Sequence, residues 1–492
     1  MTDCNRLKPL TQLQIDLPEN ISKRTRNANI DVPVGFLIHL SGLSTFKQMP
    51  ETDKSYKTIN FGTKTRPSYK PVKTTVYHGV NVDEGFDTEL YCPCCGAKLY
   101  CNGSQPVVLN HLPEGSDYTK VLVDRRRYRC SGKKCSYNYT YEPEYKANGF
   151  MITKPLLNYV ENLLRLGMTL KSIALMTGLN KNTVKRIDKK RLKVLYTETD
   201  ENGNTVLKNP ETNSRFLAVD EFKLHDGYKF ATVIIDLETG YILHLSHGKK
   251  KKCVYEFIDR VGDEWMSRVE AVAVDMNSDF EEAFLERCPH LRIVFDYFHI
   301  VKNFNEKVIT KVRIAEQERL KAEGREAEAK ALKGVKYILT SNRSTLEKKD
   351  EDAAEGKLVS RESKLFNKPE VKAKGGQMAK YLKLIEENAL LSTCDIVKTM
   401  LQEAYKCTEE DKMREKIKEI ISTCRSTQNS YFCNFAKLLE NHLDGITSHA
   451  VYHISTGRLE GINNLIKTVR RTGYGYPDDE YFFLKLFDRS RR

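Results

Sequence analysis

The chain has 492 residues, which is more than one compact core accommodates and suggests about three domains. Its 80 Lys and Arg outnumber its 66 Asp and Glu, and the net charge of +14 favours a polyanionic partner, nucleic acid first, although a basic protein without such a partner has the same balance. No apolar run approaches the roughly 18 residues of a membrane span, no signal sequence is visible, and 13 scattered cysteines indicate a reducing compartment, so we expect a cytoplasmic protein without a membrane segment.

Residues 1–85 give the weakest signal. Asp31–Leu43 fits either a strand or a short buried helix, and Lys47–Lys73 is rich in Thr, Lys, Pro and Tyr without clear periodicity. We expect a poorly defined, extended N-terminal arm with limited structure. A solvated linker is favoured over an arm that contacts DNA.

Residues 86–145 carry two cysteine pairs with the spacing of a zinc ribbon. The expected ligands are Cys92, Cys95, Cys130 and Cys135, with Cys94 as the alternative to Cys95. Four thiolates suit tetrahedral Zn²⁺ and leave no open position, so we expect a structural ion rather than a catalytic one. The expected strands between the pairs are Val107–Leu112 and Lys120–Tyr128.

Between residues 150 and 195 the apolar spacing becomes helical. One helix ends at Gly167, and two further helices flank a turn at Gly178. This pattern is typical of a helix-turn-helix DNA-binding domain, with an ordinary helical hairpin as the alternative. The outward residues of the second helix, which we expect to contact DNA, are Asn180, Lys181, Asn182, Thr183, Lys185 and Arg186.

Residues 214–305 have the element order of a ribonuclease-H-like domain, in which three hairpin-like strands precede alternating helices and parallel strands. The expected strands are Phe216–Phe222, Lys229–Asp236, Tyr241–Ser246, Val269–Asp275 and Leu291–Asp296. Asp220 follows the apolar part of the first strand, and Asp275 ends the fourth. Such a fold places two strand-borne carboxylates side by side and takes a third acid from a later helix.

Residues 306–447 are mainly helical and highly charged. We expect a helical insertion into the catalytic domain, whose central part, residues 331–374, is exposed or mobile. Residues 448–492 close the domain with two helices. The first carries Glu460, with two asparagines and Lys467 on or near the same side. Together with Asp220 and Asp275, Glu460 makes a set of three carboxylates.

These three carboxylates, Asp220, Asp275 and Glu460, are the hard oxygen ligands that Mg²⁺ or Mn²⁺ requires. Two such ions about 4 Å apart activate a water or a 3′-hydroxyl and stabilise the leaving oxygen of an in-line phosphoryl transfer. The set therefore indicates two-metal-ion chemistry on a nucleic acid.

From Glu89 to the C-terminus the sequence resembles the DDE transposases of bacterial insertion sequences, specifically the ISL-three family. The resemblance rests on the cysteine pairs, the helix-turn-helix, VDEF at 219–222, VDM at 274–276, DYFHIVKNFN at 296–305 and LEGINNLIKTVRRTGYGY at 459–476. It implies that Asp220, Asp275 and Glu460 are the catalytic triad. Where the family often has Ser-Asn-Gly before the Glu, this chain has Ser455-Thr456-Gly457 and lacks the side chain of that Asn.

The resemblance also implies the activity and the partners. The family recognises the terminal inverted repeats of an insertion sequence in double-stranded DNA, cleaves a strand with water, and transfers the freed 3′-hydroxyl to target DNA. It implies a homodimer on paired ends and a bacterial, nucleoid-associated location. The rival functions are a DNA-binding regulator that has lost catalysis and a hydrolytic nuclease without strand transfer.

Further charged residues are candidates for roles around the site. Glu221 should face away from the metal ions, because neighbouring side chains of a strand point to opposite faces. Asp296 and His299 are candidates for support of the site: His299 would bond to Asp275 or contact the scissile phosphate, with a purely structural histidine as the alternative. The basic residues expected on DNA phosphates are Lys249 and Lys250, in a four-lysine loop up to Lys252, and Lys467, Arg470 and Arg471 on the helix of Glu460.

Overall fold

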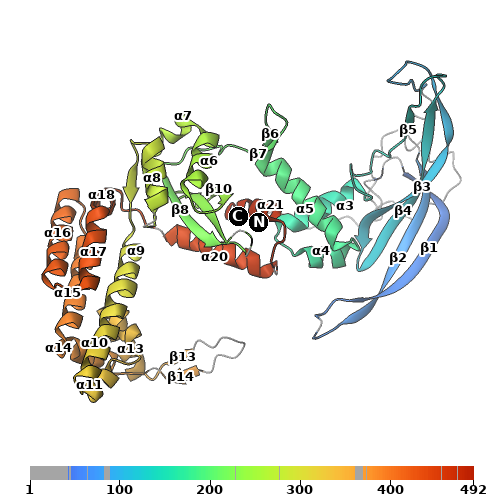
Figure 1. Ribbon diagram of the computed structural model, residues 1–492. Helices are drawn as coiled ribbons and strands as arrows, with labels where there is room; N and C mark the ends of the chain where they lie inside the picture. Colours follow the sequence, from blue (N-terminus) through green and yellow to red (C-terminus); the bar gives the residue numbers. More distant parts are fainter. Residues whose placement is uncertain are drawn as a thin grey trace, which may run out of the picture. The chain divides into compact units, whose positions relative to one another are not determined.

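The computed structural model describes residues 43, 46–63, 65–81, 89–225, 227, 229–275, 278–360, 370–372, 374–455, 457–473 and 475–492. The chain divides into two compact units, Met1–Leu195 and Tyr196–Arg492, and each is described by itself (Figure 1). Within the described residues, none of the helices combines the length and hydrophobicity that a bilayer crossing demands.

The first unit contains a five-stranded sheet. Its strands are β1 (Phe46–Asn60), β2 (Tyr69–Asn81), β3 (Leu99–Glu114), β4 (Asp117–Cys130) and β5 (Asn138–Thr140). The order is β1-β2-β4-β3, with β5 paired to β4; β2 and β4 are parallel, and the other pairs are antiparallel. The buried centre of this sheet includes Leu43, Leu109 and Val121.

The expectation of limited structure before residue 85 is wrong for β1 and β2, which form a long antiparallel hairpin. Thr, Tyr, Ile and Val favour strands, but most side chains of β1 are exposed on both faces. A strand without a buried face needs no alternation of apolar and polar residues, so its sequence lacks the periodic signal. Of Asp31–Leu43, only Leu43 lies within the described residues, and it is buried.

Three helices follow the sheet: α3 (Lys154–Arg165), α4 (Leu170–Thr177) and α5 (Lys181–Tyr196). Thr153 and Thr169 begin the first two, because each side chain accepts a hydrogen bond from a backbone N–H of the first turn. Gly178, with φ of 70°, ends α4. The helices share a buried core that includes Leu156, Ile173, Val184 and Ile187.

The second unit is built around a mixed sheet with the order β10-β9-β8-β11-β12. The strands are β8 (Phe216–Lys223), β9 (Phe230–Asp236), β10 (Ile242–His247), β11 (Ala271–Val274) and β12 (Arg292–Val294), and a separate small hairpin precedes them, β6 (Thr197–Thr199) and β7 (Thr205–Leu207). β8, β9 and β10 are antiparallel, whereas β11 is parallel to both β8 and β12. All five expected strands are present; β8 and β10 each end one residue beyond the expected range, and the other three lie within it.

Helices cover both faces of this sheet (Figure 1). One face packs on α6 (Lys251–Val261), α7 (Asp263–Met266) and α8 (Ser278–Arg287); the other packs on α20 (Gly457–Thr472) and α21 (Asp479–Ser490). Alternation along β8 decides the face: Leu217 and Val219 point to the α6 side, and Ala218 and Phe222 point to the α20 side.

A helical insertion separates β12 from α20, and its helices lie side by side as a bundle (Figure 1, yellow to orange). Its elements are α9 (Tyr297–Phe304), η3 (Asn305–Ile309), α10 (Thr310–Ala322), α11 (Glu326–Ala331), α12 (Lys336–Thr340), α13 (Arg343–Ala354), β13 (Leu358–Ser360), β14 (Glu370–Lys372), α14 (Gln377–Glu386), α15 (Ala389–Ala404), α16 (Glu410–Ser426), α17 (Ser430–Asn441), α18 (Leu443–Thr447) and α19 (His449–Tyr452). Its buried residues belong to the same apolar cluster as the α6 face of the sheet.

The expectation that residues 331–374 are exposed or mobile is wrong for α12 and the start of α13. Val335, Ile338, Leu339 and Leu346 are buried in the shared cluster. Apolar residues are sparse here, but those present fall on the inward side of short helices, and a count of Lys and Glu does not reveal that placement.

Candidate active site and metal centre

Two of the predicted carboxylates lie on adjacent parallel strands. The register pairs Val219 of β8 with Val274 of β11, so the next residues, Asp220 and Asp275, are neighbours at the same edge. Asp275 directly follows the end of β11. Because side chains alternate along a strand, both aspartates point to the face that α20 covers.

Asp220 is held by two hydrogen-bond donors. The Asn463 side-chain amide on α20 donates to Oδ2 at 2.6 Å, and the backbone N–H of Glu221 donates to Oδ1 at 2.7 Å. Burial raises the pKa of Asp220, these two hydrogen bonds oppose the rise, and the charge of Asp275 adds to it. The sequence does not by itself indicate this role of Asn463. The available signal is its spacing of three residues from Glu460, which places both residues on or near the same side of the helix.

Asp275 is paired with His299 of α9. Nδ1 of His299 lies 3.0 Å from Oδ1 of Asp275, and the imidazole is largely buried. Burial opposes the charged imidazolium, but the hydrogen bond and charge of Asp275 raise the pKa of His299. Of the roles expected for His299, this geometry corresponds to the bond to Asp275. Asp296, also buried, directly precedes α9 and adds negative charge near His299.

Glu460 lies in the first turn of α20 and is exposed. Among the described residues, Glu460 and the two aspartates do not form a group whose carboxylate oxygens all lie within 4.8 Å of one another. The helix that carries Glu460 nevertheless packs against the aspartate-bearing face, since Asn463 on the next turn bonds to Asp220. Thr456 lies outside the described residues.

Glu221 and the four-lysine segment form ion pairs on the other side of β8. Nζ of Lys249 lies 3.5 Å from Glu221, and Nζ of Lys250 lies 2.9 Å from Asp279. The prediction of a four-residue loop is wrong, because Lys251 and Lys252 begin α6. Their ammonium groups are near carboxylates as well, although the side chains of Lys250 and Lys252 remain mostly exposed.

The basic residues of α20 differ in their surroundings. Arg470 donates through Nη1 to the backbone oxygen of Lys223 at 2.6 Å, which fixes the helix to the end of β8. Lys467 and Arg471 are exposed. Of the three cations predicted to contact phosphates from this helix, these two are therefore the accessible ones.

The expected DNA-contacting residues of α5 are also unequal. Asn180 uses its side-chain oxygen to accept from the backbone N–H of Asn182 at 2.8 Å, which begins the helix. The Arg186 guanidinium lies over the ring of Phe150, 5.3 Å from its centre. Lys181 and Asn182 are exposed, whereas Thr183 and Lys185 are half-buried.

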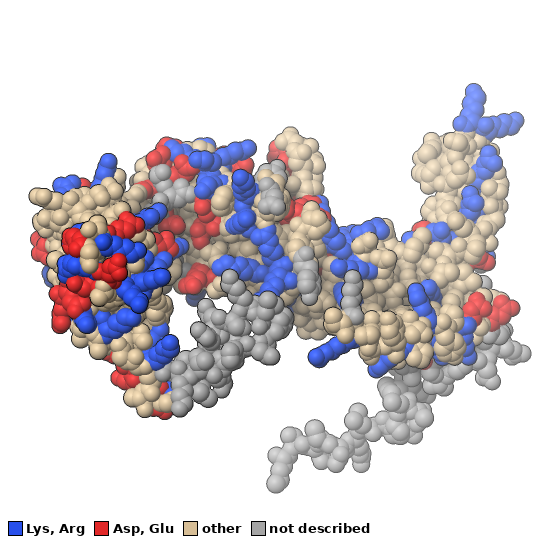
Figure 2. Space-filling view, turned by 60° about the horizontal axis from the view of Figure 1, so that its bottom comes forward, with Lys and Arg blue, Asp and Glu red and all other residues tan. Residues whose placement is uncertain are grey.

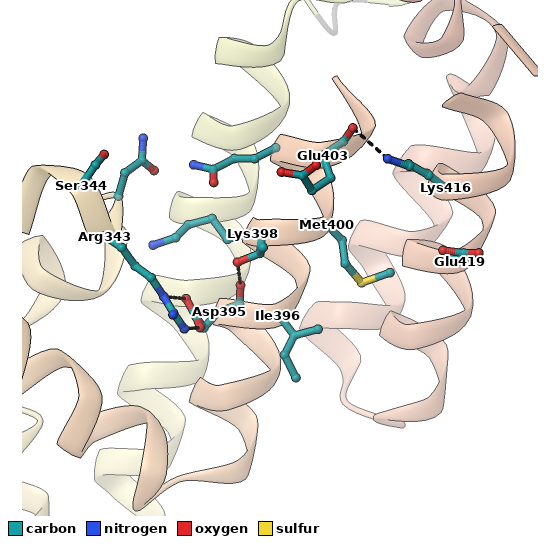
Figure 3. A pocket seen from close by; sticks show the side chains of 12 residues that line it. Arg343, Ser344, Asp395, Ile396, Lys398, Met400, Glu403, Lys416 and Glu419 are labelled. Carbon is teal, nitrogen blue, oxygen red and sulfur yellow. Dashed lines mark hydrogen bonds and ion pairs between the residues drawn. The ribbon is translucent and has the colours of Figure 1, made fainter. Parts of the chain in front are cut away.

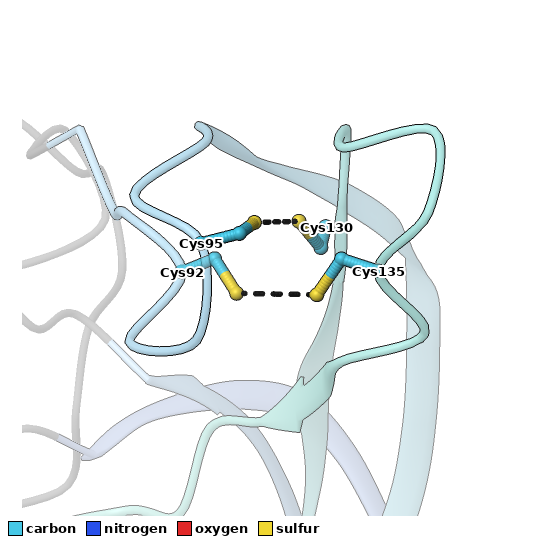
Figure 4. Close-up of side chains that lie close together, drawn as sticks. All are labelled: Cys92, Cys95, Cys130 and Cys135. Carbon is cyan, nitrogen blue, oxygen red and sulfur yellow. Dashed lines mark hydrogen bonds between the residues drawn. The ribbon is translucent and has the colours of Figure 1, made fainter.

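Four cysteines converge at one end of the first unit (Figure 4). The Sγ atoms of Cys92 and Cys135 are 3.6 Å apart, those of Cys95 and Cys130 are 3.3 Å apart, and all four lie within 4.8 Å of one another. Tetrahedral zinc with bonds of about 2.3 Å requires sulfurs about 3.8 Å apart, so the quartet fits Zn²⁺. Cys94 is outside the quartet and exposed.

The surroundings of the quartet also favour metal binding. Burial opposes ionisation of Cys92, but backbone N–H groups of Cys94 and Cys95 lower its pKa. For Cys130 and Cys135 a backbone hydrogen bond acts to lower the pKa, but burial and the neighbouring sulfurs raise it overall, so the first thiolate forms at Cys92. A Cβ atom at Gly132 would lie 3.2 Å from the sulfur of Cys95 and 3.3 Å from that of Cys130. A side chain at this position would therefore crowd the two sulfurs.

A pocket of about 570 Å³ lies in the helical insertion, between α13, α15 and α16 (Figure 3). Three of its charged groups are paired with neighbouring side chains or with the backbone. Arg343 and the Tyr381 hydroxyl both donate to the carboxylate of Asp395, and the ammonium of Lys398 donates to the carbonyls of Leu339 and Ser341. Because these partners are internal, the pocket presents no clear ligand chemistry.

Comparison with known families gives the class of the protein. Residues 217–486, more than half of the chain, match the model of the DDE transposase family ISL3, described as Transposase. The chain belongs to the ISL3 family of DDE transposases.

Individual relatives agree with this class. The chain is 26% identical over 400 residues to the "Transposase for insertion sequence element IS1001" of Bordetella parapertussis, an alignment that covers 81% of this chain and 88% of the relative. It is 22% identical over 282 residues to the "Transposase for insertion sequence element IS1557" of Mycobacterium tuberculosis, covering 54% of this chain and 57% of the relative.

Proposed function

We propose that this protein is a DNA transposase that binds the terminal inverted repeats of an insertion sequence and carries out divalent-metal-dependent strand cleavage and strand transfer. Asp220, Asp275 and Glu460 are its catalytic residues. The observation that carries the proposal is the juxtaposition of Asp220 and Asp275 on neighbouring strands, facing the helix of Glu460, within a chain of a transposase family.

The side chains around the two aspartates fit Mg²⁺ or Mn²⁺. Each carboxylate oxygen has two acceptor sites, so the bonds to Asn463, Glu221 and His299 leave sites for a metal. The side-chain oxygen of Asn463 is buried and has no hydrogen-bond partner, and magnesium retains water ligands that donate hydrogen bonds. When bound, the ions would supply Lewis-acid activation of the attacking oxygen and neutralise the leaving oxygen.

The surrounding residues of the chain would orient these ligands. Asn463 fixes the carboxylate of Asp220, and His299 fixes that of Asp275, as hydrogen-bonded partners of metal ligands commonly do. Glu460 would complete the set from α20. Lys467 and Arg471, both exposed on that helix, would contact phosphates of the bound strand.

DNA recognition is assigned to the first unit. A helix-turn-helix of α4 and α5, with Lys181 and Asn182 exposed, would read the terminal repeat, beside a zinc ribbon with the Cys92 quartet as its structural site. The ribonuclease-H-like assignment of the second unit is supported by three antiparallel strands followed by parallel β11 and β12. A homodimer on paired ends completes the proposal.

The test uses a DNA substrate with the inverted repeats found in the genomic DNA beside the gene. Asp220→Ala, Asp275→Ala and Glu460→Ala should each abolish magnesium-dependent cleavage while DNA binding stays nearly unchanged. Glu221→Ala is the matched control, because Glu221 neighbours Asp220 but pairs with Lys249 on the opposite face, and it should retain cleavage. Cleavage by a triad variant would remove that residue from the set. Binding without any cleavage by the natural protein would favour a regulator, and cleavage without joining would favour a nuclease.

A further inference from the structure

The distal half of the β1–β2 hairpin extends beyond the sheet to which it belongs. The parallel pairing of β2 with β4 begins at Thr74 and covers residues through Gly79. Beyond Thr74, the residue pairs from Tyr56–Lys73 to Asn60–Tyr69 continue outward, and among the described residues these strand segments pair only with each other. At about 3.3 Å per residue, this two-stranded ribbon projects roughly 16 Å from the sheet, turn excluded. Figure 1 shows the same long blue ribbon.

This projecting ribbon carries positive charge without negative charge. Residues 54–73, which comprise the ribbon, its turn and the two residues before it, contain no Asp or Glu, and their basic residues are Lys54, Lys57, Lys64, Arg66, Lys70 and Lys73. Lys54, Lys57, Arg66 and Lys70 are exposed, and no ion pair joins them to another described residue. The four lysines from 249 to 252 differ, because each lies near a carboxylate.

The difference is visible at the surface. On the face drawn in Figure 2, acidic and basic side chains are interspersed over the helical insertion, whereas acidic ones are few over the first unit. A cluster of positive charges on a projecting element attracts a polyanion, and among the described residues no ion pair neutralises these charges.

Two tyrosines share one face of the ribbon with two of the lysines. Tyr56 lies directly opposite Lys73, and Tyr69 lies opposite Asn60 on the same face, which Lys54 also shares. Tyr56 is 71% exposed and Tyr69 is 67% exposed. A large aromatic ring left in water on a strand packs on no core of its own chain, and it offers both a flat apolar surface and a hydroxyl to a partner.

Hydrogen bonds among the described residues hold the end of the ribbon together. The Asn60 side-chain oxygen accepts from the backbone N–H groups of Gly62 and Ser68, both at 2.9 Å. A Cβ atom at Gly62 would lie 2.2 Å from the backbone oxygen of Arg66, so only glycine permits this turn. A preorganised ribbon loses less conformational entropy on binding than a flexible tail does.

We propose that the β1–β2 hairpin is a second DNA-binding element, which inserts into a groove of duplex DNA with its lysines on phosphates and Tyr56 and Tyr69 on sugars and base edges. The major groove admits a two-stranded β-ribbon as well as an α-helix. The choice of DNA as the polyanion rests on the proposed function. The observation of a projecting basic ribbon without ion pairs is independent of that function. The hairpin would bind DNA that flanks the segment contacted by α5.

The test compares two sets of four substitutions with equal loss of charge. The hairpin set is Lys54→Gln, Lys57→Gln, Arg66→Gln and Lys70→Gln; the control set is Lys330→Gln, Lys333→Gln, Lys336→Gln and Lys348→Gln, all exposed in the insertion. Binding of the full chain to a terminal-repeat duplex is measured by fluorescence anisotropy at several salt concentrations. The hairpin set should lower the slope of log affinity against log salt by about 3–4, since each lost phosphate contact contributes about 0.9, and the control set should leave the slope unchanged.

A second variant tests the aromatic contacts. Tyr56→Ser with Tyr69→Ser should weaken binding without changing the salt slope, because no phosphate contact of a cation is lost. Equal slopes for the hairpin set and the natural protein would overturn the proposal, and so would tighter binding of single-stranded RNA than of duplex DNA. A natural protein that binds DNA through the hairpin but never cleaves it would leave this inference standing and remove the catalytic proposal, so the two failures are distinguishable.

Discussion

Two adjacent acidic residues of β8, Asp220 and Glu221, have different surroundings because their side chains point to opposite faces of the sheet. Asp220 bonds to Asn463 of α20, and Glu221 pairs with Lys249 beside α6. A shift of one residue along β8 therefore decides whether a carboxylate lies beside Asp275. The same alternation places Asp275 on the Asp220 side of β11.

The buried carboxylate of Asp220 should cost the protein stability when no metal is bound. Burial raises its pKa, which means that the charged form is disfavoured in the folded state. Asp220→Asn removes the charge, and the unpartnered oxygen of Asn463 becomes an acceptor for the new amide. We expect the melting temperature without divalent cations to rise, by about 2 °C for each kcal/mol gained in a unit of this size. Differential scanning calorimetry measures the shift.

The control for this experiment is Glu221→Gln. Its carboxylate is partly exposed and paired with Lys249, so neutralising it should not raise the melting temperature. An unchanged or lower melting temperature for Asp220→Asn would contradict the argument that the site is held at a cost to stability.

The sequence predicted the two aspartates but not the partner of Asp220. Apolar runs that end in Asp locate a carboxylate on a strand, and parallel strands bring such ends together. The bond from Asn463 to Asp220 spans 243 residues of chain, and it depends on how α20 crosses the sheet. No local pattern encodes that crossing. The pairing of His299 with Asp275 is one of the alternative roles that the sequence suggested for this histidine.

At the scale of elements, one carboxylate joins three parts of the second unit. Asp479, in the first turn of α21, accepts from Nε2 of His225 at 3.0 Å and from Nε2 of His247 at 2.9 Å. His225 follows β8, and His247 ends β10. The closing helix is thereby tied to the sheet at both an inner and an outer strand.

This junction should make stability depend on pH in the acid range. Burial of Asp479 acts to raise its pKa, but the hydrogen bonds and charges of the two histidines lower it overall. A lowered folded-state pKa gives stabilisation that is complete above the unfolded value of about 3.9 and is lost as pH falls through the folded value. Asp479→Asn should therefore melt below the natural protein at pH 5–8, and the difference should shrink below about pH 4. Melting curves across pH measure this.

A matched control is Asp411→Asn, an exposed residue in the first turn of α16, which should change melting little at any pH. A difference for Asp479→Asn that persists unchanged to pH 3 would show that the charge of this carboxylate does not contribute.

The hairpin β1–β2 shows the limit of sequence prediction at this scale. The helices were predictable because each has one buried face and therefore a period, and the central strands because both of their faces are buried, which gives short apolar runs. The hairpin has two solvated faces over most of its length, so its sequence carries strand-favouring residues without a period. Its turn, by contrast, contains Asn60, Gly62 and Pro67, residues typical of turns.

At the scale of the whole molecule, the two units have separate cores, and the cysteine quartet belongs to the first. Removing zinc with a strong chelator should therefore unfold or destabilise Met1–Leu195 and leave Tyr196–Arg492 folded. Limited proteolysis with mass spectrometry should show new cleavage sites confined to the first unit. The natural protein should hold about one zinc per chain by elemental analysis.

The control is the double variant Cys92→Ser and Cys130→Ser, which should bind no zinc and should gain no further cleavage sites on chelation. Cleavage sites that appear equally in both units would contradict their independence. An unchanged zinc content in the double variant would remove these cysteines as ligands.

The shared core of the sheet and the insertion bears on how copies of such a gene decay. Phe304, Leu401 and Phe435 of the insertion are buried in the same cluster as Val219 and Val274, the residues that precede the two aspartates. Random substitutions in the insertion therefore reach the strands that carry the carboxylates, although they alter no chemical group there. A silent copy of this element can keep every residue of the triad and still be inactive, and its sequence alone, read at the motifs, would not reveal the loss.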